Sequence, residues 1–259
     1  YYIQLGQRVG SQTFYNYFDA FGFTSRTGVD LPSETGFMQY YKANQLGEVQ
    51  LASSAFGQAM AITPLQMCTA VAAAVNGGYL VKPHVVDKIT DANGNVIEEI
   101  GANVRRQVIS ESTSNVIRQI MEYEVGNGTG GGKYAYVSGY RIGGNSGTSE
   151  QLNMDRRADG DYKKVASFAA VLPADDPEII VYVMLDDPNN ARTDYSSLLA
   201  APVVGNIISE IAPYLGIAAD GEDRSQTVVT VPNLVGTEWS IAQVQLNIKG
   251  LRHQLAEST

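Results

Sequence analysis

The spacing of apolar residues along the chain predicts several helices. The clearest runs from Thr63-Pro64 to Gly77-Gly78, where a wide apolar face lies between a capping threonine with a helix-starting proline and a glycine stop. Residues 1–21 predict one or two amphipathic helices ending at Phe21-Gly22. Two more helices are expected, one from Ser110 or Ser112 to about Tyr123 and one over Tyr195–Leu215, the latter packed on a sheet.

Strand patterns occupy much of the remaining chain. Tyr79–Thr90 and Asn95–Glu99 flank Asp91-Ala92-Asn93-Gly94, a hairpin turn signal. Tyr140–Ser149, Val165–Pro173 and Glu178–Leu185 are typical of three strands, and the short Asp-Asp-Pro turn between the last two makes that pair antiparallel. We therefore predict an α+β fold in which helices flank an antiparallel sheet.

A change of character near the C-terminus predicts a division of the chain. Residues 1–218 form the main domain, 219–227 are a polar linker, and 228–259 are a small α+β tail with a strand, a turn, a helix and a strand from about Leu251. Hydrophobic residues make up 44% of the chain and charged residues 17%, which suits a sizeable core. No run reaches about 18 consecutive apolar residues, so no membrane span is expected here.

Composition excludes several classes of function. The net charge is −9 and no basic patch dominates, so nucleic acid is not an expected partner. Cys68 lies in an apolar helical run and is interpreted as a small buried hydrophobe. His84 and His253 are far apart, so no metal-ligand spacing arises, and neither a metal nor a cofactor is expected.

The glycine-rich stretch Gly126–Gly132 is not a phosphate-binding loop. That motif needs a glycine six positions before its lysine and a hydroxyl residue after it, but Asn127 and Tyr134 stand at these positions around Lys133. We expect a mobile connection instead.

Two short stretches each allow two interpretations. Arg141–Glu150, with the letters RIGGNSGTSE, is either a surface turn of Gly, Asn and Ser or a strand that lets a ligand lie against its backbone. Phe56-Gly57-Gln58 is either a tight turn before a helix or part of the same site.

The order of several motifs resembles the class B penicillin-binding proteins. The motifs are Ser53-Ser54-Ala55-Phe56-Gly57-Gln58, Ile62-Thr63-Pro64-Leu65-Gln66-Met67, Asn76-Gly77-Gly78-Tyr79, Lys82-Pro83, Gly143-Gly144-Asn145-Ser146-Gly147-Thr148 and Asp175-Asp176-Pro177-Glu178. The tail from Val229 to Gly236 resembles the opening of a PASTA module. Such a module binds muropeptides or packs on the catalytic domain, and the second role is expected here.

The resemblance implies a peptidoglycan transpeptidase fold and an acyl transfer by a serine nucleophile. The third family motif, Lys-[Ser/Thr]-Gly-Thr, falls on residues 145–148, with Asn145 in place of the lysine. By resemblance, the backbone N–H of Thr148 supplies half of an oxyanion hole, and the hydroxyls of Ser146 and Thr148 bind the substrate's terminal carboxylate. Gly147 lets the ligand backbone approach. Gly57 and Gln58 are expected to bind substrate.

The other two family motifs, S-x-x-K and S-x-N, do not occur in these residues. The resemblance therefore implies that the nucleophile lies on a missing N-terminal half of the same protein, ahead of Tyr1. It also implies stem peptides and β-lactam antibiotics as ligands, a membrane glycosyltransferase as partner, and an N-terminal anchor at the extracytoplasmic face of a bacterial membrane.

Asn145 favours a second hypothesis. Asparagine donates hydrogen bonds but carries no charge, so carboxylate binding and turnover are expected to be weak. The alternative to an active transpeptidase is thus an impaired or non-catalytic cell-wall binding or scaffold protein of the same fold. A form engineered or cleaved for structural work is a third possibility.

Overall fold

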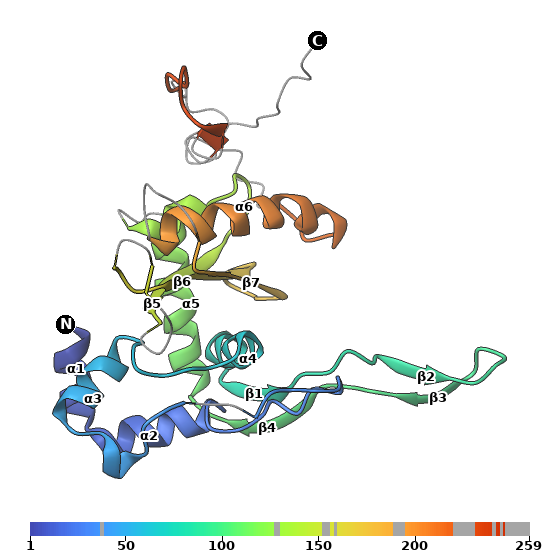
Figure 1. Cartoon of the computed structure of the whole chain (residues 1–259). Helices are drawn as coiled ribbons and strands as arrows, with labels where there is room; N and C mark the ends of the chain where they lie inside the picture. Colours follow the sequence, from blue (N-terminus) through green and yellow to red (C-terminus); the bar gives the residue numbers. More distant parts are fainter. Residues whose placement is uncertain are drawn as a thin grey trace. The chain divides into compact units, whose positions relative to one another are not determined.

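The computed structural model describes residues 1–36, 39–126, 130–151, 156–157, 160–188, 195–219, 231–239, 242–243 and 246. The chain divides into two compact units, Tyr1–Val116 and Ile117–Thr259. Helices accompany antiparallel strand pairs in both units, which confirms the predicted α+β class (Figure 1).

The first unit contains α1 (Tyr2–Val9), α2 (Ser11–Ala20), the 3₁₀ helix η1 (Ala43–Gln45), α3 (Glu48–Ala55), α4 (Pro64–Val75), β1 (Tyr79–Lys82), β2 (Lys88–Thr90), β3 (Val96–Glu99) and β4 (Asn103–Gln107). The amphipathic stretch 1–21 is two helices, because Gly10 has φ +80° and breaks the run. Gly6 lets α1 approach α3 closely, since a Cβ there would lie 2.5 Å from the Cβ of Ala55.

The predicted start of α4 is confirmed in detail. The N–H of Gln66 donates to Thr63 Oγ1 at 3.1 Å, and the Gln66 side chain accepts from the N–H of Thr63 at 2.9 Å. This reciprocal capping box satisfies two N–H groups that the first turn would leave without partners. Cys68, within α4, is partly buried, and this burial raises the pKa of its thiol.

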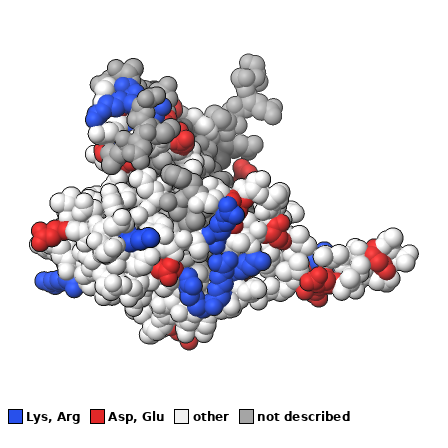
Figure 2. Space-filling view, turned by 60° about the horizontal axis from the view of Figure 1, so that its bottom comes forward, with Lys and Arg blue, Asp and Glu red and all other residues white. Residues whose placement is uncertain are grey.

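Two antiparallel pairs form the strands of this unit, β1 with β4 and β2 with β3. The β2–β3 hairpin extends beyond the other pair as an arm (Figure 1). Its turn is the predicted one, because Asp91 accepts hydrogen bonds from Asn95, Asn93 and Gly94 that lower the pKa of its carboxyl. Acidic side chains gather on this arm (Figure 2), namely Asp87, Asp91, Glu98 and Glu99.

The second unit takes in most of α5 (Glu111–Gly126), then η2 (Gly131–Ala135), β5 (Gly143–Glu150), β6 (Lys164–Leu172), β7 (Ile179–Asp186) and α6 (Ser196–Tyr214). The N–H of Thr113 donates to Ser110 Oγ at 3.2 Å, which identifies Ser110 as the residue that opens α5. The three strands form one antiparallel sheet in the order β5-β6-β7. The antiparallel pairing of β6 with β7 is the one that the sequence predicted.

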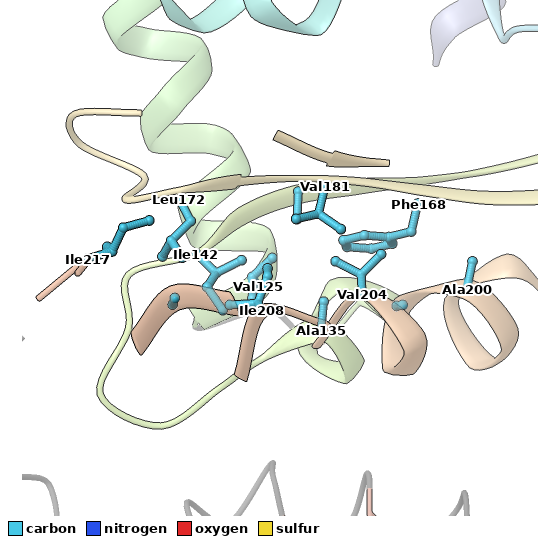
Figure 3. Close-up of a cluster of buried hydrophobic side chains, with 13 residues drawn as sticks. Val125, Ala135, Ile142, Phe168, Leu172, Val181, Ala200, Val204, Ile208 and Ile217 are labelled. Atoms are coloured by element: carbon cyan, nitrogen blue, oxygen red, sulfur yellow. The ribbon is translucent and has the colours of Figure 1, made fainter. Parts of the chain in front are cut away.

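α6 covers one face of this sheet and builds the core of the unit. Phe168 of β6 is fully buried and lies beside Val204 of α6, with Val181 of β7 next to it (Figure 3). α6 is the helix of the described residues that is long and apolar enough to cross a membrane. Its residues Ala200, Val204 and Ile208 are nevertheless fully buried in this core cluster, as in the core helix of a globular domain.

The C-terminal predictions fall partly outside the described residues. Only Ala219 of the predicted linker 219–227 is among the described residues. Both predicted strands of the tail lie outside the described residues, except for Val231. The predicted turn is present, since the N–H of Val235 donates to Asn233 Oδ1 and that of Thr237 to Leu234 O. Trp239 is half-buried, and Ala242 and Leu246 are buried. Of the predicted connection Gly126–Gly132, residues 127–129 lie outside the described residues, whereas Gly126 ends α5 and Gly131 and Gly132 belong to η2.

Candidate functional site

β5 is the edge strand of the described sheet. It pairs with β6 without a bulge from Gly143 opposite Val171 to Glu150 opposite Lys164, and no described strand lies on its other side. The stretch GGNSGTSE is therefore a regular strand, and the surface-turn interpretation of it is wrong.

The register decides which backbone groups of β5 face β6. The N–H of Gln151 donates to Lys163 O at 2.8 Å. Glu150 is opposite Lys164, so the next pair in the same register is Gln151 and Lys163. Hydrogen-bonded positions alternate along an antiparallel pair, so the odd-numbered residues of β5 bond to β6. The N–H and C=O groups of Ser146 and Thr148 therefore point away from β6, toward the outer edge.

The side chains of the predicted site divide between the two faces of β5. Asn145 and Gly147 share one face, and Ser146 and Thr148 share the other, because side chains alternate along a strand. Asn145, Gly147 and Thr148 are exposed, and Ser146 is half-buried. The two hydroxyls thus stand roughly 7 Å apart along one face, beside the outward-pointing backbone groups.

Two contacts fix the start of β5. Gly144 lies under the ring of Phe168, where a Cβ would be 2.5 Å from Cε1. The Arg141 guanidinium donates to both carboxylate oxygens of Glu122 on α5, at 2.6 and 2.9 Å, and also to Asp175 in the turn between β6 and β7. The strand that carries the candidate residues is therefore held on a packed core and by a bidentate ion pair.

Thr148 makes a contact that the sequence did not reveal. Its Oγ1 donates to the Oγ of Ser196 at 2.9 Å and accepts the N–H of Ser196 at 3.3 Å. Ser196 is the first residue of α6 and is only 3% exposed. The two residues are separated by 48 positions, and no local sequence signal joins them.

Gly57 and Gln58 belong to the first unit, so they are described apart from β5. They follow α3 rather than precede a helix: the N–H of Gly57 bonds to Ser54 O and that of Gln58 to Ser53 O, both at 3.0 Å. This pattern, with φ +86° at Gly57, is a Schellman turn that requires glycine for structural reasons. Next to it, Ala59 has φ +61°, a conformation disfavoured for a residue with a Cβ.

Among the described residues, no group of three or more His, Cys, Asp and Glu side chains could hold a metal ion. Apart from the carboxylate of Glu150 at its end, β5 offers neutral hydroxyl, amide and backbone groups. Those groups can hold an extended peptide and a carboxylate, but they include no base strong enough to activate a nucleophile.

Comparison with known proteins decides the family. Residues 1–209 match the penicillin binding protein transpeptidase domain. The chain belongs to the penicillin-binding protein transpeptidase family. The fold agrees: the chain resembles penicillin binding protein 3 of Mycobacterium tuberculosis, solved in complex with ampicillin, with a TM-score of 0.73 and 28% identity over 86% of this chain and 50% of that one.

Two relatives that match most of this chain have names that state a role. Stage V sporulation protein D of Bacillus subtilis is 35% identical over 95% of this chain and 39% of its own length. The probable peptidoglycan D,D-transpeptidase FtsI of Caulobacter vibrioides is 33% identical over 88% of this chain and 38% of its own. The chain thus spans about two fifths of these relatives.

Proposed function

We propose that β5 forms one wall of the cleft of a serine-type peptidoglycan D,D-transpeptidase. The observation that carries this proposal is the outward direction of the N–H and C=O groups of Ser146 and Thr148 on an edge strand. An edge strand of this kind can take an extended peptide as an additional strand. The D-Ala-D-Ala end of a stem peptide is such a peptide.

Each residue of the strand has a chemical role in this proposal. The N–H of Thr148 is proposed as half of an oxyanion hole, donating to the carbonyl oxygen of the attacked bond as that oxygen gains negative charge. One such donor stabilises the transition state by roughly 3–4 kcal/mol. The hydroxyls of Ser146 and Thr148 donate to the terminal carboxylate. Gly147 leaves room for the ligand backbone. Gly57 and Gln58 are proposed to bind substrate in addition to forming their turn.

The nucleophile is proposed to be a serine outside these 259 residues, because neither S-x-x-K nor S-x-N occurs in them. That serine attacks the D-Ala-D-Ala bond, expels D-alanine and forms an acyl-enzyme, which the amine of a neighbouring stem then resolves into a cross-link. β-Lactams mimic the dipeptide and arrest the reaction at the acyl-enzyme. The structures of the Mycobacterium tuberculosis relative with aztreonam and with ampicillin support this ligand class.

The family also supports a location and partners for the whole protein. We place it at the extracytoplasmic face of a bacterial membrane, anchored by an N-terminal segment and working beside a membrane glycosyltransferase. We propose that residues 228–259 are the first part of a PASTA module. The linker 219–227 connects this module to residues 1–218, on which it is proposed to pack.

Asn145 supports a second candidate function. A neutral amide where the family has lysine weakens carboxylate binding, so a cell-wall binding or scaffold protein with little or no turnover is the alternative.

Labelling with a fluorescent penicillin tests the choice between the two. The full-length protein is expected to acquire one covalent label, which peptide mapping should locate on the serine of an S-x-x-K motif outside residues 1–259. Absence of label at saturating penicillin, in a protein that binds peptidoglycan fragments, would favour the scaffold and contradict the transpeptidase.

A further inference from the structure

The contact between Thr148 and Ser196 joins the candidate substrate strand to the first turn of α6. Tyr195, the residue that precedes the helix, makes no side-chain hydrogen bond as a cap. Thr148 Oγ1 takes over that task from the neighbouring strand, because it accepts the N–H of Ser196 at 3.3 Å. One acceptor position of the Thr148 hydroxyl is therefore occupied by a donor that cannot rotate.

The hydroxyls of Thr148 and Ser196 lie at hydrogen-bonding distance and can exchange the donor and acceptor roles. A hydroxyl has one donor and two acceptor positions, and its proton rotates to suit its partners. Here the Thr148 proton points to Ser196 Oγ at 2.9 Å, so it is directed away from a ligand. If the Ser196 hydroxyl rotates and donates to Thr148 Oγ1 instead, the Thr148 proton is released from Ser196 and can turn to a ligand.

We propose that Ser196 is a positioning residue that directs the Thr148 hydroxyl toward the carboxylate of the bound peptide or β-lactam. In the unliganded state Ser196 accepts the Thr148 proton, and in the liganded state it donates to Thr148 Oγ1 while Thr148 donates to the carboxylate. Its burial, with 3% of its surface exposed, removes water as a competing partner for this exchange. The proposal rests on the transpeptidase function proposed above.

A double-mutant cycle tests this role. The rate constant for acylation by benzylpenicillin is measured in the full-length protein and in its Ser196→Ala, Thr148→Val and doubly substituted forms. Ser196→Ala is expected to lower the rate about fivefold, the effect of losing one neutral hydrogen bond. Thr148→Val is expected to lower it about tenfold, and the double variant should equal Thr148→Val, because Ser196 acts only through Thr148.

Matched variants separate positioning from folding. Ser209→Ala removes an exposed hydroxyl of the same helix, which bonds to Asn206 O, and should leave acylation unchanged. Ser196→Thr keeps the hydroxyl and the N–H and should retain most of the rate. Thermal unfolding of every variant shows whether α6 is intact.

The same cycle is run in the Asn145→Lys background, so that a slow natural protein does not hide the effect. The role of Ser196 would be overturned if the rate of the double variant fell by the product of the two single effects, or if Ser196→Ala left the rate unchanged. Neither result would contradict the proposed transpeptidase function. Absence of acylation in both backgrounds would overturn the transpeptidase and, with it, this role.

Discussion

Replacing Asn145 by lysine is expected to raise the rate of acylation of the full-length protein by a penicillin about fivefold. Asn145 is exposed on the edge strand, so the longer side chain meets solvent and not the core. A hydrogen bond from a charged donor to a carboxylate is about twice as strong as one from a neutral amide. Since a neutral hydrogen bond is worth about 1 kcal/mol, the gain in binding the carboxylate is about 1 kcal/mol, which corresponds to this factor.

The control for this prediction is Asn145→Met, which has nearly the length of lysine without its charge. Stopped-flow measurement of acylation should show the increase in Asn145→Lys alone, and the increase should shrink as salt is added, because exposed charges are screened. Equal rates in the lysine and methionine variants would mean that position 145 does not limit carboxylate binding.

Gly144→Ala is expected to destabilise the second unit by about 3 kcal/mol, or roughly 6–12 °C in melting temperature. The new Cβ would lie 2.5 Å from Cε1 of Phe168 and 3.0 Å from Ala169 O. Phe168 is fully buried between the sheet and α6, so its ring cannot turn away without displacing other core residues (Figure 3).

Gly147→Ala is the matched substitution on the same strand. Its Cβ would meet only Ser167 Oγ, at 3.1 Å, in an exposed position, and the lost freedom of the unfolded chain offsets that small strain. Its melting temperature should therefore stay close to that of the natural protein, while acylation falls because the Cβ stands where the ligand backbone approaches. Similar melting temperatures for the two alanine variants would contradict the packing described for Gly144.

Local signals explain what the sequence predicted correctly. The Thr63 cap, the Asp91–Gly94 turn and the short turn that pairs β6 with β7 are each decided by residues close together in the chain. The edge position of β5 could also be expected, because the family resemblance assigned the glycine-rich strand to a ligand.

Long-range contacts explain what the sequence did not predict. Every residue of β4 is exposed and the strand has no apolar alternation, yet it pairs with β1 while Arg106 donates to the backbone oxygens of Asp19 and Ala20. α3 buries only Leu51 and Ser54, too few to give a helical signal. Ser196 was missed because its partner Thr148 is distant in sequence.

The central claim is that Ser146 and Thr148 on β5 hold the carboxylate end of a transpeptidase ligand. A crystal structure of the full-length protein acylated by ampicillin tests it most directly. The ligand should lie along the outer edge of β5, with its carboxylate within hydrogen-bonding distance of Ser146 Oγ and Thr148 Oγ1 and its carbonyl oxygen on the N–H of Thr148. A covalent ligand whose carboxylate and carbonyl oxygen contact other residues, with β5 left unoccupied, would contradict the claim.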